Sequence, residues 1–500
     1  MVENVKNIKN KDLKNGTYII NQPGIYKLVE NIIFHPNSDN DFQPRDDQEL
    51  IYPKHKGYVL GFFAAFVIES EDVIFDMCGH SIDCSKEFNL KQRFFSIIEL
   101  ASSPFIPKQG PANFGKSIIP AKNCVIQNGI LGLTPHHGIH GNNMSYIYIK
   151  KILFRDYEVA GISLNGGTNI YIENCKLCGT SQNIQMLSTY SHCRFDLPFL
   201  EKIVKRDPTL LLKINNDQTC TVQKIYDDVV SEMKLFEDHV LYGTEYNGIF
   251  TNKTKLMDDN VYGIALNSMG VLVNDFKDLR DDKTIGNENI YLKNIIINNT
   301  ISNASEIVGF FKKQDDITVQ NSYGKDEFCG PVGDIFNIQN CIDKNGCYVS
   351  NIVGNMQLVV KKYGIGPNGQ NLAGTSNFDD FILNEWLPLL DINMNELCVN
   401  GDFYYYVYGR DSMGHVMKGN IGLFISQGLN ITVENIIIDG VINNGKSKGP
   451  NKNSSQSIGI GICGSKKINI KNKIIKNVIS RNGDQEKIKI INLNEDISIY

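Results

Sequence analysis

The feature that most constrains this chain is a six-residue frame that recurs along it. The frame reads polar or small, apolar, any residue, apolar, polar, asparagine, and it occupies residues 123–128, 169–174, 289–294, 316–321, 346–351, 430–435 and 467–472. Residues 72–77 and 146–151 follow the same frame without the final asparagine. Apolar residues at alternate positions are typical of a β-strand with one buried face. Each frame therefore predicts one short strand, and the fold must stack many such strands.

The spacing of the frames predicts how the strands are stacked. Asn128, Lys151 and Asn174 end three successive frames, and each lies 23 residues after the one before. A second strand that opens with glycine precedes several frames; these glycines are Gly138, Gly161, Gly309 and Gly422. Strands of ~3.3 Å per residue, with their turns, use about that many residues in one coil of a solenoid. Equivalent residues should then lie above one another, with Ile126, Ile149 and Ile172 in one inward stack.

The asparagine that ends each frame has a physical reason to be there. Asparagine tolerates the left-handed backbone conformation that a tight turn needs, and its side chain can bond to its neighbours. On stacked coils such side chains can form a ladder. The frame therefore predicts a turn after each strand, with the asparagines of successive coils in one row.

The long gaps between frames predict insertions that leave the solenoid at its turns. We expect insertions at about 178–288 and 352–429, and apolar residues at helical spacing predict an amphipathic helix over 221–241. Residues 1–58 should form an N-terminal cap over the apolar end of the solenoid, which spans 59–480. Residues 481–500 should add a C-terminal capping strand.

These repeats resemble those of the right-handed parallel β-helix proteins with the pectin-lyase-like fold. The segment 72–82, Asp-Val-Ile-Phe-Asp-Met-Cys-Gly-His-Ser-Ile, looks like an early coil of such proteins. The segment 16–28, with Gly-Thr-Tyr and Pro-Gly-Ile-Tyr, is similar to the lead-in of uncharacterised β-helix proteins of giant DNA viruses. The resemblance implies an all-β fold, a right-handed parallel β-helix solenoid with an N-terminal cap and a partly helical insertion. It implies no single function, because this fold hosts both enzymes and structural proteins.

Composition and charge restrict the kinds of binding partner that the chain is expected to have. The chain has 50 Lys+Arg against 55 Asp+Glu, a net charge of -5 and a pI near 6.0, which argues against a nucleic-acid partner. The apolar segments are too short to span a membrane, and the first residues lack the apolar core of a signal peptide. Synthesis in the cytoplasm is therefore expected, with reduced cysteines. Cys175 and Cys178 have the spacing of half a zinc site, but no matching pair follows, so no metal and no cofactor are expected.

The polysaccharide-cleaving members of this fold give a first test for catalysis. A hydrolase of the polygalacturonase type needs an Asn-Thr-Asp motif, an Asp pair, Gly-His-Gly and Arg-Ile-Lys in that order. Here Gly138-Ile-His-Gly comes before the pair Asp315 and Asp316, and the other two motifs are absent. The two aspartates are better explained as turn residues before a strand.

Histidines give the densest group of titratable residues. His137 and His140 lie on one strand, and Arg155, Asp156 and Glu158 lie in the equivalent turn one coil later. His140 should stack on Ser163 and point outward, so that its replacement by alanine would hardly change stability. If the protein is an enzyme, these five residues are the candidates for a groove with acid–base chemistry. The alternative is an ordinary solvated turn.

Two functions remain open. The favoured hypothesis is a non-enzymatic structural or surface protein, a virion component whose faces bind a glycan or a neighbouring subunit. The alternative is a polysaccharide hydrolase or lyase with its site near residues 136–163. The expected partners are a polysaccharide or glycan, other virion proteins or further copies of the chain; the protein would be made in the cytoplasm and packaged in the virion.

Overall fold

The computed structural model describes most of the repeated part of the chain. The described residues are 4–53, 56–58, 61–92, 95–104, 118–179, 201, 204–205, 208–209, 211–214, 218–245, 269–274, 276–278, 283–302, 420–443, 456–481, 483–491 and 497–499. The frames at 316–321 and 346–351, Gly309, and the pair Asp315 and Asp316 lie outside them.

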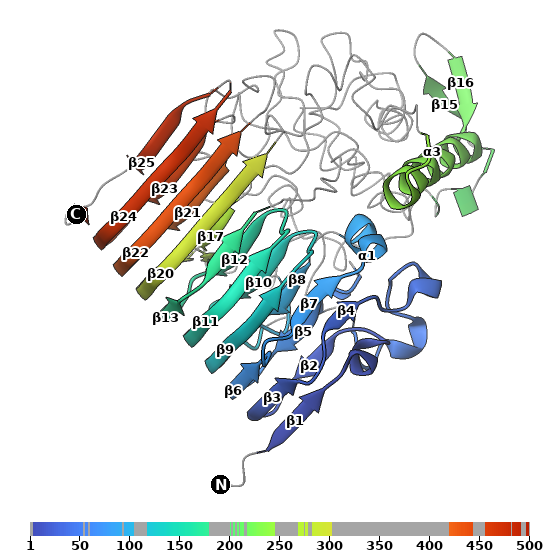
Figure 1. Ribbon diagram of the computed structural model, residues 1–500. Helices are drawn as coiled ribbons and strands as arrows, with labels where there is room; N and C mark the ends of the chain where they lie inside the picture. The colour runs from blue at the N-terminus through green and yellow to red at the C-terminus, as the bar shows by residue number, and fades with distance from the viewer. Residues whose placement is uncertain are drawn as a thin grey trace.

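Two long parallel sheets form the body of the protein (Figure 1). The first sheet has 13 strands: β1 (Val5–Ile8), β3 (Gly24–Leu28), β4 (Ile32–Phe34), β6 (Glu71–Asp76), β7 (Ser81–Cys84), β9 (Lys122–Leu131), β11 (Ser145–Arg155), β13 (Thr168–Glu173), β14 (Lys176–Cys178), β20 (Asn287–Ser302), β22 (Gly428–Asn443), β24 (Lys466–Ser480) and β26 (Ile497–Ile499). The second sheet has nine: β2 (Tyr18–Ile20), β5 (Ala64–Ile68), β8 (Ser96–Glu99), β10 (His137–Asn142), β12 (Ala160–Asn165), β17 (Met269–Asn274), β21 (Asn420–Ser426), β23 (Ser457–Cys463) and β25 (Gln485–Ile491).

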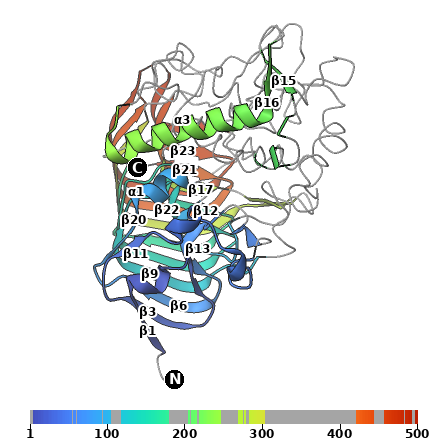
Figure 2. The ribbon, with the colours of Figure 1, turned by 90° about the vertical axis from the view of Figure 1, so that its right-hand side faces the viewer.

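The chain alternates between the two sheets as it winds. From β8 onward each coil contributes one strand to the second sheet and then one or two to the first, so every neighbour in a sheet comes from the next coil. All strand pairs within these two sheets are parallel; β4 with β7 and β20 with β22 are examples. The protein is thus an all-β, right-handed parallel β-helix. Its coils are stacked along one axis (Figure 2).

The inward stack predicted from the frame is confirmed. Ile149 pairs in register with Ile126 on one side and with Ile172 on the other. The row continues to Leu292, Val433 and Ile470. All of these side chains are fully buried, so burial of apolar surface in this column is a main source of stability.

Asparagine ladders hold the turns, as predicted. Asn174, Asn294, Asn435 and Asn472 all have left-handed backbone, with φ between 52° and 57°. Their amides bond in series: Nδ2 of each of the last three donates to Oδ1 of the preceding one at 2.9, 2.9 and 3.0 Å. A second ladder joins Asn169, Asn289 and Asn430, which begin the same frames. Both ends of each frame are therefore corners of the coil.

Coils that lack the asparagine keep the same backbone. Tyr146 and Lys151 occupy the corner positions of β11 and have φ of 55° and 56°. A left-handed tyrosine or lysine is costly in isolation. The coils above and below impose this conformation, because their strands must stay in register.

Glycines open the strands of the second sheet where backbones come close. A Cβ at Gly138 would lie 2.5 Å from the carbonyl oxygen of Gly161 and 2.7 Å from Cδ1 of Phe154. Gly270 and Gly422 occupy the same place in later coils. No side chain fits there, which explains the glycine that the sequence shows before several frames.

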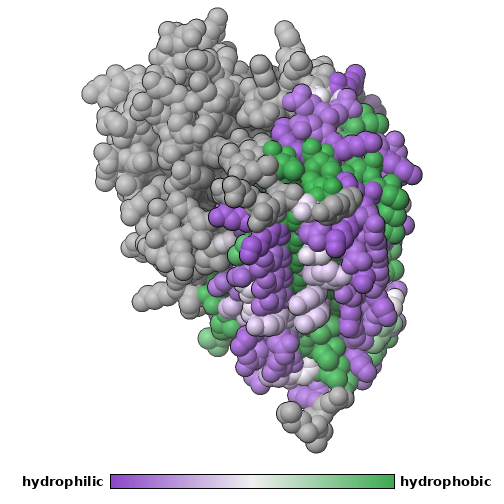
Figure 3. Space-filling view, turned by 90° about the vertical axis from the view of Figure 1, so that its left-hand side faces the viewer, coloured by the Kyte–Doolittle hydropathy of each residue, from purple (hydrophilic) through white to green (hydrophobic). Residues whose placement is uncertain are grey.

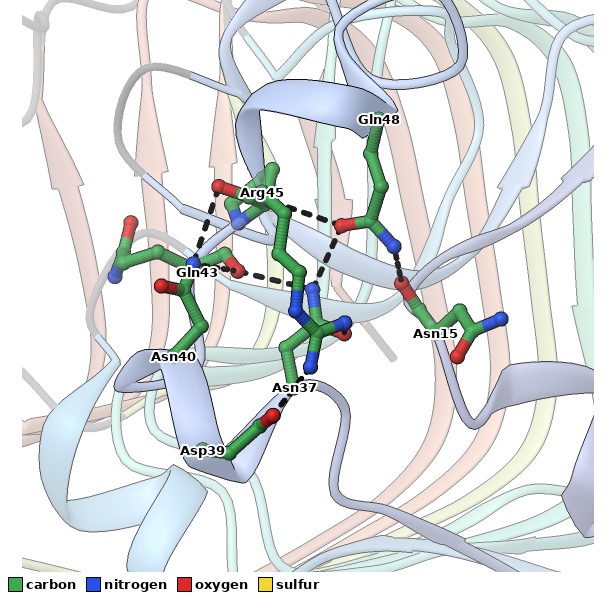
Figure 4. A network of polar contacts seen from close by, with 8 residues as sticks. Asn15, Asn37, Asp39, Asn40, Gln43, Arg45 and Gln48 are labelled. Atoms are coloured by element: carbon green, nitrogen blue, oxygen red, sulfur yellow. Dashed lines mark hydrogen bonds and ion pairs between the residues drawn. The ribbon is translucent and has the colours of Figure 1, made fainter.

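The N-terminal segment joins the solenoid directly. Strand β1 pairs with β3, which pairs with β6, and β2 pairs with β5. The loop after β4 is fastened by a polar network around Asn37 (Figure 4). Arg45 donates to Asn37 Oδ1 at 2.6 Å, while Asn37 Nδ2 donates to Gln48 Oε1 at 2.7 Å. The boundary of the cap at residue 58 stays a prediction.

The predicted helix in the first insertion is confirmed as α3 (Val222–Tyr242). Thr221 caps its N-terminus, and Gly243 ends it in the left-handed conformation. The helix lies beside α1 (Lys86–Lys91), with Lys91 Nζ 3.5 Å from a carboxylate oxygen of Glu237. Short hairpins, β15 (Leu211–Ile214) with β16 (Gln218–Thr221) and β18 (Phe276–Asp278) with β19 (Lys283–Ile285), also fall in this insertion.

The inward stack makes a direct prediction. Ile172→Asp should lower the free energy of unfolding by more than about 4 kcal/mol, because it buries an unpaired charge. Thr432→Asp, at an outward position of the first sheet, should change it by less than about 1 kcal/mol. Urea unfolding followed by circular dichroism measures both. A stable Ile172→Asp variant would contradict the inward placement.

The ladders make a second prediction. Asn294→Ala should cost about 2 kcal/mol, because it removes two hydrogen bonds and puts alanine in the left-handed region. Asn294→Gly loses the same bonds but keeps the backbone conformation at little strain, so it should cost less. Thermal unfolding compares the two. Equal losses would show that the backbone conformation at this corner contributes nothing.

Candidate functional site: a buried histidine chain and an exposed tyrosine row

Three neighbouring strands of the second sheet bring the predicted histidines onto one face. In β8, β10 and β12 the outward residues Glu99, His140 and Ser163 form one row, and Ser96 pairs with His137 in the next. The register of His140 with Ser163 is as predicted. Ile139, between the two histidines, faces the core. The face therefore collects polar side chains from coils that are distant in sequence.

His140 is paired with a buried carboxyl group. Its Nδ1 lies 2.7 Å from Oε2 of Glu99, and the hydroxyl of Ser96 donates to the same oxygen at 3.0 Å. Glu99 is only 1% exposed. Its other oxygen, Oε1, has no hydrogen-bond partner among the described residues. The interaction with His140 is thus one of two that stabilise a carboxyl group almost fully removed from water.

On its other side, the His140 ring contacts a chain of hydrogen-bonded asparagine side chains. Asn142 Nδ2 lies 2.8 Å from the carbonyl oxygen of Pro104, which can only accept. The Oδ1 of Asn142 therefore accepts from Asn165 Nδ2, at 2.9 Å, and the same Nδ2 lies 3.1 Å from Nε2 of His140. That order of donors makes Nε2 an acceptor and places the proton on Nδ1, facing Glu99. The contacts on both sides therefore fix the orientation of the His140 ring.

The expectation that an outward His140 would be exposed to solvent is wrong. The ring does point outward from the strand, but its side chain is only 12% exposed and both ring nitrogens are engaged. The outer face of the second sheet is buried along much of its length, as Leu272 and Phe424 in the same row show. An outward position on this sheet is therefore an interior one. Replacement of His140 should therefore destabilise the protein.

His137 stacks on His140 and is buried with it. Their ring centroids lie 5.1 Å apart with an interplanar angle of 11°, and the His136 ring lies edge-on to that of His137, with centroids 4.0 Å apart. Burial, with smaller contributions from His136 and His140, holds the pKa of His137 well below its usual value. His137 is therefore neutral near pH 7, and a pKa this far below neutrality makes it a weak proton acceptor.

The remaining candidates lie in neighbouring turns, and one of them, Arg155, faces away from the histidines. The backbone turns do stack as expected: Val159 N donates to His136 O at 2.9 Å and Thr134 N to Asp156 O at 3.0 Å. The Arg155 side chain, however, reaches Asp83, with Nη2 2.8 Å from Oδ1. Glu158 is buried, and Asp156 is a left-handed corner residue. The groove that would join all five residues stays a prediction.

The partners of His140 are the residues that the sequence did not reveal. Glu99 comes 41 residues before His140, whereas equivalent residues of the following coils are 23 residues apart, so the spacing gave no sign of this pair. The one sign of this pair in the sequence was a glutamate within the largely apolar segment 95–101.

Cysteines give no metal centre in the described part of the chain. Cys175 is buried, and burial raises the pKa of its thiol to about 12. Cys178 lies on the neighbouring β14, and Cys193 lies outside the described residues. No cluster of three or more metal-ligating side chains occurs among the residues described. Within the same residues, no helix has both the length and the apolar character needed to cross a membrane.

The first sheet carries a different kind of surface. Tyr148, Tyr171 and Tyr291 occupy one outward row, in register on successive coils. The rings of Tyr148 and Tyr171 are stacked, with centroids 4.7 Å apart and an interplanar angle of 6°. Tyr148 is 38% exposed, and Tyr146 beside it is also exposed. We call these four residues the tyrosine row.

A row of alternating charge runs beside the tyrosines. Its members, in coil order, are Lys150, Glu173, Lys293, Glu434 and Lys471. Glu434 also accepts a hydrogen bond from the Tyr291 hydroxyl at 2.9 Å. Bands of hydrophobic and hydrophilic side chains that pass from coil to coil are visible along one face of the molecule (Figure 3). In-register stacking turns each position of the coil into such a band.

Comparison with known proteins adds little to the description of the fold. No protein-family model matches the chain, and no curated protein matches it. Among solved structures, it is similar to the surface protein and adhesin PfbA of Streptococcus pneumoniae, with 10% sequence identity and a TM-score of 0.29, over 95% of this chain and 90% of that one. A likeness this weak carries no argument about function. The class of protein, a parallel β-helix, follows from the strand pairing itself.

The buried chain predicts a stability effect at His140. His140→Ala should cost about 3 kcal/mol, because Glu99 then remains buried with the Ser96 hydroxyl as its only described partner. In a Glu99→Gln background the same change should cost markedly less, since no ionisable group is left unpaired. Chemical unfolding of the four proteins at pH 7 gives the coupling energy. A neutral His140→Ala variant would show that the pair contributes nothing.

Proposed function

We propose that this protein is a non-enzymatic structural or surface β-helix protein that binds a glycan along the tyrosine row. The single observation that carries the proposal is the stacked pair of Tyr148, which is exposed, and Tyr171, which is half-buried, beside a row of charged side chains. Tyrosine offers an apolar ring edge and a polar hydroxyl, a combination suited to sugars. A polymer lying along the solenoid axis would meet one ring and one charged group on each of these coils.

The wider setting is also part of the proposal. The similarity of segment 16–28 to the lead-in of giant-virus proteins supports a role as a virion component, made in the cytoplasm and packaged. A solenoid suits such a role, because the stacked coils give a long surface on which one binding feature is repeated. Other virion proteins would then be its neighbours.

A polysaccharide hydrolase or lyase is the second candidate. The buried pair of Glu99 and His140, with neutral His137 stacked against it, is the observation that favours it. Acid–base chemistry needs a free lone pair or a transferable proton that faces a substrate. His140 has neither while Asn165 occupies Nε2 and Glu99 occupies Nδ1, so the rigid chain supports the enzyme less well than the exposed row supports binding.

The two functions are separated by one experiment. The full-length protein is applied to a glycan array, and every glycan that binds is then tested for release of reducing sugar. We expect binding without release, and a loss of affinity of roughly tenfold or more in Tyr148→Ala and Tyr171→Ala. Thr432→Ala, on a later coil of the same outward row, is the control and should bind normally. Sugar release would overturn the non-enzymatic proposal, and absence of any glycan ligand would overturn the binding proposal.

A further inference from the structure

The hydrogen-bond chain that begins at His140 has a fixed direction. It ends at the carbonyl oxygen of Pro104, which can only accept, so Asn142 turns its Nδ2 toward Pro104 and its Oδ1 toward Asn165. Asn165 turns its Nδ2 toward Nε2 of His140 as well, at 3.1 Å. Asn142 and Pro104 are buried, so neither can exchange its partner for bulk water. The chain is complete only while Nε2 of His140 carries no proton.

A proton added to Nε2 cannot be accommodated by turning the amides. It would face the Nδ2 donor of Asn165, so that two N–H groups point at each other. If the Asn165 amide turned over, its Oδ1 would accept from His140 but would also face the Oδ1 of Asn142. If the Asn142 amide turned over too, its Oδ1 would face the carbonyl oxygen of Pro104. One contact of the chain must therefore be lost.

Glu99 gives the added proton no better place. Its Oε2 already accepts from the Ser96 hydroxyl and faces Nδ1 of His140, and a hydroxyl at its buried Oε1 would have no acceptor among the described residues. An imidazolium beside this carboxyl group, in contrast, forms a close ion pair with it. The proton therefore goes to His140, and the mismatch falls on the asparagines.

The contact most easily lost is the one at Pro104. An imidazolium donates a stronger hydrogen bond than a neutral amide does, so both asparagine amides should turn over to satisfy His140. The segment before Pro104 is paired with a neighbouring one: Ser102 N donates to Ile119 O at 3.0 Å, and Ser102 Oγ accepts from Ile119 N at 2.9 Å. Pro104 lies two residues further on. Its carbonyl group would be left buried without the amide donor, which favours movement of the segment toward water.

Other titratable groups lie in the strands and turns around His140: Glu99, His136, His137, Glu158 and Tyr58. The neighbour of His140 on β12 is Ser163, which does not titrate. Burial, with smaller contributions that include Glu99, raises the pKa of Tyr58, so its hydroxyl stays neutral in acid.

His137 adds an effect of acid that acts on the whole fold. Because burial lowers its pKa, native His137 binds fewer protons than the same residue in the unfolded chain. The protein should therefore lose stability as the pH falls below about 6.5, the ordinary value for histidine. The chain from His140 acts on one segment instead, so the two effects can be separated.

We propose that this chain is a pH-sensitive switch: a proton taken up by His140 acts through the two asparagine amides and releases Pro104 from the second sheet. Histidine is the side chain whose charge ordinarily changes between about pH 5 and pH 8, so the switch would respond to mild acid. It is independent of the glycan proposal, because the tyrosine row lies on the first sheet and plays no part in the chain.

Hydrogen exchange of the full-length protein at about pH 7.5 and about pH 5.5 tests the switch, with rates corrected for the intrinsic effect of pH. Mass spectrometry of peptides that contain Ser102 and Ile119 should show protection that is lower by roughly tenfold or more in acid. Asn174, whose N donates to the carbonyl oxygen of Lys293 on the first sheet, is the control and should keep its protection. Equal protection of Ser102 and Ile119 at both pH values overturns the proposal.

Two substitutions separate the switch from acid destabilisation of the whole fold. Asn165→Ala removes the amide that joins His140 to Asn142, so protection at Ser102 should no longer depend on pH although His140 still takes up a proton. His137→Gln removes the other buried ring and should keep the dependence. Persistence of the dependence in Asn165→Ala, or its loss in His137→Gln, would assign the effect to another group and sink the proposal.

A third variant covers the case in which Asn165→Ala does not fold. Glutamine in His140→Gln can donate to Glu99 and accept from Asn165, but it takes up no proton. Protection at Ser102 should then be the same at both pH values, and a dependence as large as that of the wild type would contradict the role of His140. Urea unfolding at about pH 7.5 shows which variants are folded.

Discussion

The constraint on which this structure depends is that successive coils must turn at the same place. A β-helix is held by hydrogen bonds between strands of neighbouring coils, so a single corner out of step would move every later side chain to the wrong face. The asparagines at the corners meet this constraint twice: they accept the left-handed backbone, and their amides bond to the corners above and below. Once this register is set, even Tyr146 and Lys151 adopt the same conformation.

In-register stacking places equivalent residues of successive coils in rows, and the residue type in each outward row determines what that part of the surface can bind. A choice of residue at one position is repeated at ~4.8 Å intervals along the axis, so its effect accumulates. Isoleucines in an inward row give a continuous core. Like charges in an outward row would repel, and the alternation from Lys150 to Lys471 avoids this. Tyrosines in an outward row stack and become rigid, which lowers the entropy lost when a ligand binds them.

Sequence reasoning succeeded where the repeat is unbroken. The stack of Ile126, Ile149 and Ile172, the asparagine turns and the register of His140 on Ser163 all follow from a spacing of 23 residues. Helix α3 followed from its own periodicity. The pairing of His140 with Glu99 did not follow, because the two residues are 41 positions apart and the repeat is 23 residues long. The burial of His140 was also beyond reach, since the covering of an outward face depends on contacts that leave no local pattern.

The contrast between the two sheets explains why binding is assigned to the first. On the second sheet, outward polar groups such as Glu99, His140 and Asn165 are buried or partly buried and bonded to one another, so their donors and acceptors are already used in holding the coils together. On the first sheet, the outward side chains remain accessible, and different rows offer different chemistry. Tyrosines and charges occupy one side of the coil, while isoleucines occupy the next. Because the left-handed corners separate these sides, the same solenoid can present different surfaces on different sides of its coils.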